Sequence, residues 1–380
     1  MQILKQIRLR NWKSIADQTI ELRPLNVMIG ANGSGKSNLI SVFKMVNAMF
    51  AREPGFRNYV GQSGGADSIL HFGKKKSPTA EMELTFDTNT GTTKYIAHWA
   101  AAAQDSLIFT DERAEFHGTN YTHPVVRHVG AGHGETQLEE IAESRKDRTC
   151  TTTLGLVRGC RLFHFHDTSA NASIRDASYI EANRYLYPDA GNLASMLYLF
   201  EKKHLTAFRR IWSAAKQMIP AFHSFLLEPS RLNDKQILLK WFQSGSDYEF
   251  GPHQLSDGSI RFLALTTLFS QPSELMPLLI AIDEPELGLH PSALEVLSGM
   301  VKSASRHCQV ILATQSPTLL DHFSADEVIV ANTRNGASEF KRLSDTELES
   351  WLKEYSLGEI WEKNVVGGGP YMTRRPLGLT

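Results

Sequence analysis

The sequence predicts an α/β protein with a mainly parallel core sheet, an antiparallel β subdomain and an inserted helical lobe. Short apolar runs alternate with helical segments in both halves of the chain, which is typical of parallel sheets. One such run, at 25–29, leads through a glycine-rich turn into a helix. The chain has 380 residues, 42% of them hydrophobic and 21% charged. This composition suits one large core or two modest ones.

Charge and cysteine content exclude several classes of protein. Lys and Arg number 40 against 41 for Asp and Glu, so no overall basic field favours nucleic acid, and any DNA contact must be local. Cys150, Cys160 and Cys308 are too scattered for a disulfide framework or a Cys-x-x-Cys metal site, which fits a reducing cytoplasm. No signal peptide and no run of roughly 18 apolar residues is present, so we expect a cytoplasmic protein without a membrane partner.

The first half of the chain begins with strand patterns. Residues 2–9 and 17–23 alternate in polarity, and the buried-type run 25–29 precedes the first helix. The segments 82–86 and 94–100 predict antiparallel strands with one face in solvent. From about residue 110 the sequence becomes rich in glycine and histidine and then helical. We therefore predict an inserted, mostly helical lobe at about 111–225.

Regular alternation returns in the second half. Strands are predicted at 237–242, 278–283, 309–314 and 327–332, with helices opening at Ser256 and Pro291. The core built around the parallel sheet would then comprise about 1–110 and 226–345. The glycine- and proline-rich residues 365–380 predict an extended tail.

The motif with the most specific chemistry lies at residues 30–37. Gly30-Ala31-Asn32-Gly33-Ser34-Gly35-Lys36-Ser37 fits the phosphate-loop pattern, with a strand before it and a helix after it. Glycines let backbone N–H groups surround phosphate, Lys36 reaches the β- and γ-phosphates, and Ser37 can hold Mg²⁺. An ordinary glycine-rich turn is the weaker interpretation. The predicted ATP-binding residues here are Asn32, Gly33, Ser34, Gly35, Lys36, Ser37 and Asn38.

An acidic pair ends the predicted strand LLIAID. Asp283 is placed to complete the metal shell, and the next residue, Glu284, to orient or deprotonate the attacking water. An acidic cap before Pro285 is the alternative, and the phosphate loop in the same chain makes it the weaker one.

A serine and a glycine open the helix in LSDGSIRFLAL, at 255–265. Free N–H groups and a hydroxyl at this helix start could bind an anion, which would involve Ser256, Asp257 and Gly258. Taken alone, Ser-Asp-Gly before an apolar helix is a good N-terminal cap and nothing more.

The order of these motifs adds information that none of them carries singly. The phosphate loop is followed by LSDGS, LLIAIDEPE, GLHP and ATQSP, and this order resembles the ATP-binding-cassette ATPases. In that family the signature motif, here Leu255–Ser259, caps ATP bound to the opposite subunit. The resemblance therefore implies ATP and Mg²⁺ as ligands and a homodimer, or a higher oligomer, in which two heads enclose ATP.

The amino-terminal segment LRNWKSIADQTIELRPLNVMIGANGSGKSN is similar to the start of a RecF- or SMC-type head. LSDGS, GLHP, ATQSP and LFHFHDTSANASIRD resemble stand-alone ATPases grouped with RecF, OLD proteins and antiphage systems. This resemblance implies ATP hydrolysis and a part in antiphage defence. The residues after Gln315 are too few for a typical domain of about 100–150 residues, so we expect a separate nuclease or toxin as effector.

One position departs from many relatives. Gln315 stands at the switch position of ATQSP, where many of them have histidine. Glutamine can hydrogen-bond the γ-phosphate, but it cannot become a cation. We therefore expect slow turnover, with Glu284, Lys36 and Gln315 as the catalytic set.

Histidines and basic clusters leave alternatives open. His164 and His166, beside Asp167, could ligate a metal from one face of a strand, or could form a polar face while the intervening phenylalanines pack in the core. Lys74–Lys76 and Arg209–Arg210 read as solvated surface rather than as a DNA site.

Two other classes of function remain as alternatives. A DNA-repair or DNA-loading ATPase predicts turnover stimulated by DNA. A transporter ATPase subunit predicts a membrane partner, and both the RecF-like start and the departure from LSGGQ oppose it.

Overall fold

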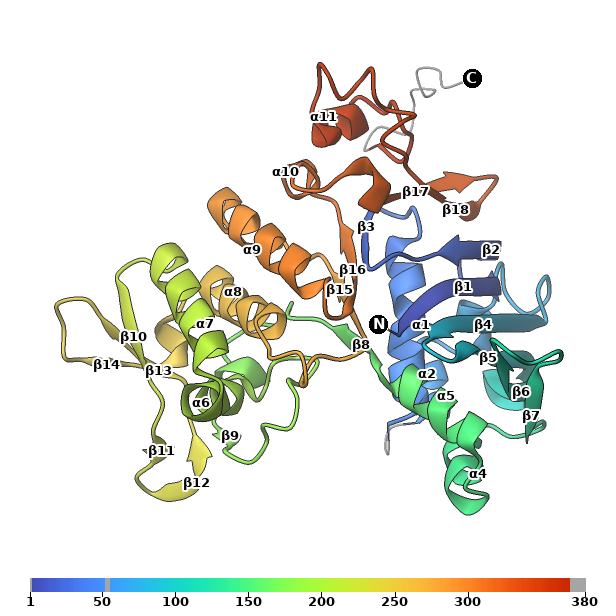
Figure 1. Ribbon diagram of the computed structural model, residues 1–380, viewed down its shortest axis with the longest axis horizontal. Coiled ribbons are helices and arrows are strands. Elements are labelled where there is room, and N and C mark those ends of the chain that lie inside the picture. Colours follow the sequence, from blue (N-terminus) through green and yellow to red (C-terminus); the bar gives the residue numbers. More distant parts are fainter. Residues whose placement is uncertain (1, 52–54, 370–380) are drawn as a thin grey trace. The chain divides into compact units, whose positions relative to one another are not determined.

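A computed structural model describes residues 2–51 and 55–369, which form two compact units (Figure 1). The first unit comprises the residues up to Leu162, then Pro277–Ala281, then those from Gln309 onward. The second unit comprises Phe163–Met276 and Ile282–Cys308. Within the described residues, no helix combines the length and the apolar character that crossing a membrane requires.

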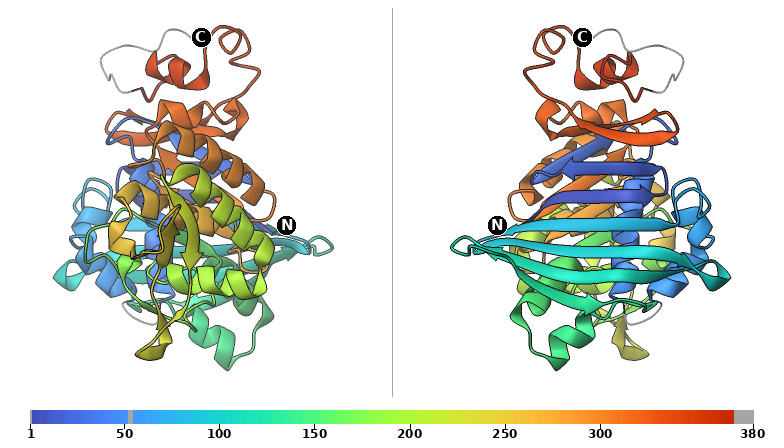
Figure 2. Two further views of the ribbon diagram at one scale, coloured as in Figure 1. Left: turned by 90° about the vertical axis from the view of Figure 1, so that its left-hand side faces the viewer. Right: turned by 90° about the vertical axis from the view of Figure 1, so that its right-hand side faces the viewer.

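An antiparallel sheet of six strands forms one layer of the first unit, in the order β2-β1-β4-β5-β6-β7. Its strands lie side by side with α1 behind them (Figure 2, right). Alternating burial along each strand explains the layer, because one face packs inward and the other meets solvent. The strands are β1 (Ile3–Trp12), β2 (Ile15–Glu21), β4 (Thr79–Thr88), β5 (Gly91–Ala102), β6 (Ser106–Gly118) and β7 (Val125–Gly130).

The second sheet has the order β18-β17-β3-β16-β15-β8. Strand β3 runs parallel to both β16 and β17, and the edge strand β18 is antiparallel to β17. The central strands are buried along most of their length, as parallel sheets require. The strands are β3 (Leu25–Ile29), β8 (Cys160–Phe163), β15 (Leu279–Asp283), β16 (Gln309–Thr314), β17 (Val328–Arg334) and β18 (Ala337–Arg342).

Helix α1 (Lys36–Met49) is buried among side chains of both sheets. Trp12, Phe56, Trp99 and Phe109 form an aromatic cluster in this core, with ring centroids 5.4–6.5 Å apart. Such large buried rings supply much of the stabilising apolar area. The other helices of this unit are α2 (Phe56–Gln62), α3 (Ala66–Ile69), α4 (Leu138–Ser144), α5 (Arg148–Arg158), α10 (Pro317–Leu320) and α11 (Leu357–Glu362).

The second unit is built from four helices and two small three-stranded sheets. Ala214, Phe262 and Ala293 join α7, α8 and α9 in a small core. The helices are α6 (Leu193–Lys203), α7 (Leu205–Met218), α8 (Asp257–Phe269) and α9 (Pro291–Ala304). The strands are β9 (Ser178–Tyr179), β10 (Phe222–Leu226), β11 (Pro229–Ser230), β12 (Asn233–Ile237), β13 (Lys240–Gln243) and β14 (Glu249–Phe250).

Several helices and strands have positions that agree with those predicted from the sequence. The antiparallel pairing aligns Met82 with Ala97, α9 begins at Pro291, and β16 spans 309–314. All three cysteines are free and buried, which agrees with the prediction of no disulfide framework.

The predicted lobe at 111–225 differs from the structure. Residues 106–118 and 125–130 are strands that extend the antiparallel sheet, so the second unit begins at Phe163 and runs to Met276. The alternation of β6 is weakened by charged residues on its solvent face and by the buried Glu112, which hid the strand from an apolar-periodicity argument. The predicted strand 237–242 is also divided, between β12 and β13. Of the predicted tail, residues 370–380 lie outside the described residues.

Candidate functional site

The phosphate loop lies between the end of β3 and the start of α1, as its pattern requires. Gly33 and Gly35 have φ angles of 79° and 103°, which favour glycine strongly. A Cβ atom on Gly35 would also overlap the hydroxyl of Ser338, so this position needs glycine for space as well. Glycines in this left-handed conformation let the backbone of a loop curve around an anion.

Lys36 and Ser34 place polar atoms inside this loop. The Lys36 side chain is buried, and its Nζ donates to the carbonyls of Gly30 at 2.5 Å and Ala31 at 3.2 Å. The Ser34 hydroxyl is buried and has no hydrogen-bond partner within the described part of the chain. A buried hydroxyl without a partner costs free energy that a bound phosphate oxygen would recover. The loop therefore fits a phosphate group.

Three segments distant in sequence hold this loop in place. Asn38 donates through Nδ2 to the Ser14 hydroxyl at 2.7 Å, and Ser338 donates to the same oxygen at 2.7 Å. Trp12 Nε1 donates to the carbonyl of Asn38 at 3.1 Å. The carbonyl of Gly368, near the carboxyl end, accepts the N–H of Ala31 at 2.8 Å. Asn38, which the sequence predicts as an ATP-binding residue, braces the loop in this way, and its role as a ligand stays a prediction.

Gln315 lies at the same sheet edge as the phosphate loop. Its strand, β16, pairs in parallel with β3 so that Thr314 is opposite Ile29, the residue before Gly30. The half-buried Gln315 follows directly. Parallel strands end at a common edge, so Gln315 and the phosphate loop follow neighbouring strands at the same edge of the sheet, and the contact of Gln315 with a γ-phosphate stays a prediction.

Asp283 is the last residue of β15 and Glu284 follows it, and both belong, with the signature segment, to the second unit. Both are half-buried. Glu284 has φ 47°, a left-handed conformation that costs a side-chain-bearing residue about 1–3 kcal/mol. His166 Nε2 is 2.9 Å from the carbonyl oxygen of Asp283. A strained acidic residue at this point is an observation that favours a functional carboxylate.

The signature segment caps helix α8 and leaves its start exposed. The Ser256 hydroxyl accepts the N–H of Ser259 at 3.1 Å, which is the predicted N-terminal cap. A Cβ atom on Gly258 would overlap the carbonyl of Gly288, so close packing of these backbones requires glycine. Ser256 and Asp257 are exposed. The helix therefore presents its positive end to solvent.

Two buried arginines, which sequence analysis did not single out, organise the second unit. Arg175 Nη2 donates to Asp257 Oδ1 at 2.7 Å, and its other nitrogens donate to the carbonyls of Thr168, Pro252 and Leu255. Arg261, one turn after the signature, donates through Nε to Phe165 at 2.8 Å and through Nη2 to His166 at 3.0 Å. Its Nη1 donates to the carbonyl of Leu287. The sequence offered one signal for Arg261, which is its position two residues after the end of the signature segment.

Arg261 joins three segments that carry predicted site residues. It lies on the signature helix, it holds the backbone of His166, and it holds the turn after the Asp283-Glu284 pair. Burial lowers the pKa of its guanidinium from the ordinary value, and Asp257 opposes this shift. The pKa of arginine is so high that the group stays charged.

Replacing Arg261 with methionine should lower the free energy of unfolding by roughly 2–4 kcal/mol, because three carbonyl groups lose the charged donor that a buried guanidinium supplies. Urea denaturation measures this change. The matched control is Arg209→Met, since Arg209 is exposed on α7 and a surface substitution should change stability by less than about 0.5 kcal/mol. Equal stabilities of the two variants would contradict the bracing role of Arg261.

The alternation in LFHFHD agrees with the polar-face interpretation. Phe163 and Phe165 are buried, whereas His164 and His166 are exposed. Among residues 2–51 and 55–369, no group of three or more His, Cys, Asp or Glu side chains could hold a metal ion. The alternative of a metal site at His164, His166 and Asp167 is therefore not supported.

The predicted residues fall into two sets. The phosphate loop and Gln315 come together in the first unit, and Asp283, Glu284 and the signature belong to the second. That the two sets act on one nucleotide stays a prediction.

Two family models match the chain. One, described as "AAA domain, putative AbiEii toxin, Type IV TA system", matches residues 162–321. The other, described as "AAA domain", matches residues 6–149. The first covers the signature and the acidic pair, and the second covers the phosphate loop.

Part of the chain is similar in sequence to two chromosome partition proteins, and its fold is similar to that of solved Smc heads. The chain is 37% identical over 94 residues to the chromosome partition protein Smc of Mycoplasma genitalium and likewise to that of Mycoplasma pneumoniae. The match covers 23% of this chain and only 9% of each relative. An Smc head bound to the C-winged helix domain of ScpA has a TM-score of 0.58 at 14% identity, over 92% of this chain and 99% of that one. A Pyrococcus furiosus Smc head, bound to the C-terminal domain of ScpA, has a TM-score of 0.57 at 15% identity, over 93% and 99%. These likenesses confirm the predicted fold class.

Proposed function

We propose, from the premise that this chain is an SMC- and RecF-like P-loop ATPase of the ATP-binding-cassette type, that it binds and hydrolyses ATP as an ATP-dependent dimeric clamp. The observation that carries the proposal is the phosphate loop, with a buried lysine and a buried hydroxyl inside a glycine-shaped backbone. Fold alone does not define an activity, so the argument rests on this site.

Residues of the first unit hold the phosphates in this proposal. Lys36 exchanges its bonds to the Gly30 and Ala31 carbonyls for bonds to the β- and γ-phosphates. Ser37, which is exposed at the first turn of α1, and Asp283 are oxygen ligands of the kind that Mg²⁺ prefers. Bound Mg²⁺ neutralises charge that develops on the phosphates.

Glu284 and Gln315 act on the γ-phosphate end. Glu284 orients or deprotonates the attacking water, and the carbonyl of the preceding residue is held by His166. Gln315 donates an amide hydrogen bond to the γ-phosphate and loses it on hydrolysis. The amide of Gln315 cannot become a cation, so ATP turnover is slow. Bound ATP then mainly holds the two heads together.

A second copy of the chain completes the site. Ser256 and Gly258 lie at an exposed helix start whose N–H groups and hydroxyl would contact ATP on the opposite head. ATP then stabilises the closed dimer, and its hydrolysis removes the bridging contacts.

Replacing Lys36 with alanine should weaken ATP binding roughly 10- to 100-fold, because charge-assisted hydrogen bonds to phosphate are lost. Calorimetric titration of the full chain with ATP and Mg²⁺ measures the affinity. The matched control is Lys44→Ala, because Lys44 is exposed on the same helix and should leave the affinity unchanged. Equal affinities of Lys36→Ala and wild type would exclude this loop as the ATP site.

The cellular role that we propose is antiphage defence, in which the clamp controls a separate effector protein, a nuclease or a toxin. The family description that names a toxin and a type IV TA system supports it. Purification of the chain from its own host, with and without ATP, followed by mass spectrometry and mass photometry, tests the proposal. A co-purifying effector protein is the expected result, and an ATP-dependent dimer with no protein partner would contradict it.

DNA repair or DNA loading is a second candidate, because the curated relatives are chromosome partition proteins. It predicts that DNA co-purifies with the dimer and that double-stranded DNA raises the rate of ATP turnover. The absence of both effects in the same preparations would exclude it.

A further inference from the structure

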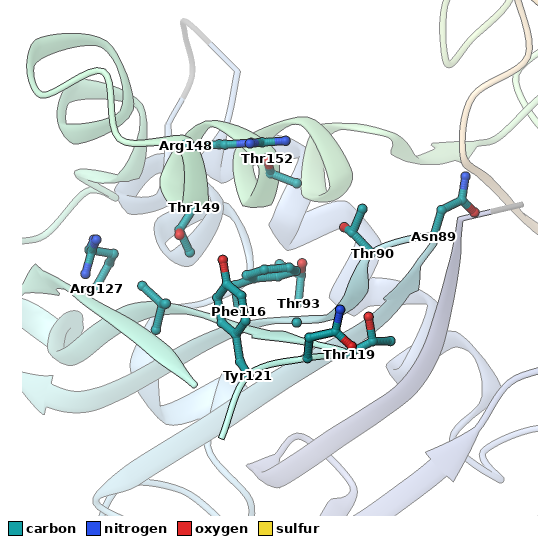
Figure 3. A pocket seen from close by; sticks show the side chains of 13 residues that line it. Asn89, Thr90, Thr93, Phe116, Thr119, Tyr121, Arg127, Arg148, Thr149 and Thr152 are labelled. Carbon is teal, nitrogen blue, oxygen red and sulfur yellow. The ribbon is translucent and has the colours of Figure 1, made fainter. Parts of the chain in front are cut away.

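A cavity of about 600 Å³ lies in the first unit between helix α5 and the turns of the β4–β5 and β6–β7 hairpins. In Figure 3, Thr149 and Thr152 project from α5 above it, Thr93 and Phe116 lie on the strands below, and Tyr121 lies in the turn after β6. Its volume is within the range of small-molecule sites, about 300–1,000 Å³. None of the sequence motifs includes its lining residues.

The cavity lies at the opposite end of the antiparallel sheet from the phosphate loop. Trp12, at the end of β1, bonds to Asn38 beside that loop. Thr93 pairs with Phe86, which in turn pairs with Leu4 at the start of β1. Eight strand residues separate the two ends, a length of about 25 Å. The cavity is thus separate from the ATP site.

A buried threonine hydroxyl lines this cavity and has no hydrogen-bond partner among the described residues. Thr93 is 1% exposed, and its Oγ1 has no hydrogen-bond partner within the described part of the chain. Its neighbour Thr92, on the other face of β5, does bond, donating to Asp87 Oδ1 at 3.2 Å. An unsatisfied buried hydroxyl is costly and rare in native proteins, so Thr93 indicates a partner that arrives from the cavity.

The charge of the cavity wall favours an anion. Arg127 and Arg148 line it, and no carboxylate does among the described residues. Arg127 Nε donates to Asp147 at 2.6 Å, so part of its charge is already compensated. Arg148 is exposed at the first turn of α5 and has the freedom to meet a phosphate.

The rest of the wall favours a flat ring with polar edges. Tyr121 is 51% exposed, and its ring stands edge-on to Phe116 with centroids 5.7 Å apart. Threonine hydroxyls and asparagine amides surround these rings, contributed by Asn89, Thr90, Thr119, Asn120, Thr149 and Thr152. Hydroxyls and amides can donate and accept, which suits a nucleobase edge and a sugar.

We propose that this cavity binds a nucleoside monophosphate group, with its base on Tyr121, its polar edge at Thr93 and its phosphate at Arg148. Two sources share this chemistry, a free mononucleotide and the 5′-phosphorylated end of a nucleic-acid strand. The proposal does not depend on ATP hydrolysis, because the cavity residues lie outside the phosphate loop.

The test is titration of the full chain, with its phosphate loop saturated by a non-hydrolysable ATP analogue and Mg²⁺. The probes are AMP, GMP, CMP and UMP, and a ten-residue oligothymidylate with either a 5′-phosphate or a 5′-hydroxyl. Binding of a mononucleotide identifies a free ligand. Binding of the 5′-phosphorylated strand alone identifies a strand end.

Thr93→Val and Arg148→Ala should each weaken binding about tenfold, as loss of one hydrogen bond or one charged contact predicts. Thr92→Val, on the opposite face of β5, and Arg145→Ala, an exposed arginine outside the cavity, should bind as the wild type does. The melting temperature of Thr93→Val should equal or exceed that of the wild type, because no internal bond is lost, so weaker binding would not reflect misfolding. The proposal is overturned if no probe binds at millimolar concentration, or if Thr93→Val and Arg148→Ala bind like the wild type.

Discussion

Replacing Glu284 with glutamine is expected to lower ATP turnover about a thousandfold and to leave ATP trapped between two copies of the chain. Glutamine keeps the size of the side chain but cannot accept a proton, and a positioned general base contributes about 10²–10⁴-fold. Glu284 has φ 47° and follows a residue whose carbonyl oxygen is held by His166. This backbone is preserved in the variant, so ATP binding should be unchanged.

Phosphate release under single-turnover conditions measures the rate, and mass photometry with ATP measures the dimer. Glu295→Gln is the matched control, because Glu295 is exposed on α9 and should turn over ATP like the wild type. A Glu284→Gln variant that stays monomeric with ATP would count against the clamp. A variant that hydrolyses ATP at the wild-type rate would remove Glu284 from the catalytic set.

Replacing Ser256 with arginine should also lower turnover, about a thousandfold, while a single chain keeps its affinity for ATP. Ser256 caps α8 at an exposed position, and a long side chain there removes the contacts that this helix start would make with ATP on the opposite head. The phosphate loop is in the first unit and Ser256 in the second, so a single chain should bind ATP without it. Ser244→Arg, which adds the same side chain at an exposed turn of the second unit, is the control.

Mixing Ser256→Arg with Lys36→Ala chains tests whether one site uses two chains. A mixed dimer has one intact site, formed by the phosphate loop of the first variant and the signature of the second. Half of randomly formed dimers are mixed, so about a quarter of the wild-type rate should return. A mixture no more active than its components would show that each chain acts alone.

Local motifs could be predicted from the sequence because their chemistry restricts both residue type and spacing. Positive φ angles at Gly33 and Gly35 require glycine, so the glycine pattern predicts the backbone conformation of the phosphate loop. Ser256 as a cap and Pro291 as the first residue of a helix follow from equally local rules. Buried strands such as 309–314 were evident from continuous apolar residues.

Contacts between distant segments could not be predicted in this way. Arg175 and Arg261 are single arginines, and nothing local in the sequence indicates which carbonyls they bind. Glu112 is a charged residue inside a strand, where it accepts a hydrogen bond from Tyr95 at 2.7 Å, so its burial depends on a partner 17 residues away.

The sequence by itself determined the glycine-rich loop between a strand and a helix, the order of the predicted site residues and the α/β class, because these depend on residue spacing and backbone conformation over a few residues. The tertiary structure alone decided that the antiparallel sheet continues to residue 130 and that the lobe begins at Phe163. It also decided that Thr93 lines a cavity without a hydrogen-bond partner. Strand pairing, burial of polar groups and cavities depend on which distant segments pack together, and side-chain packing across the fold sets them.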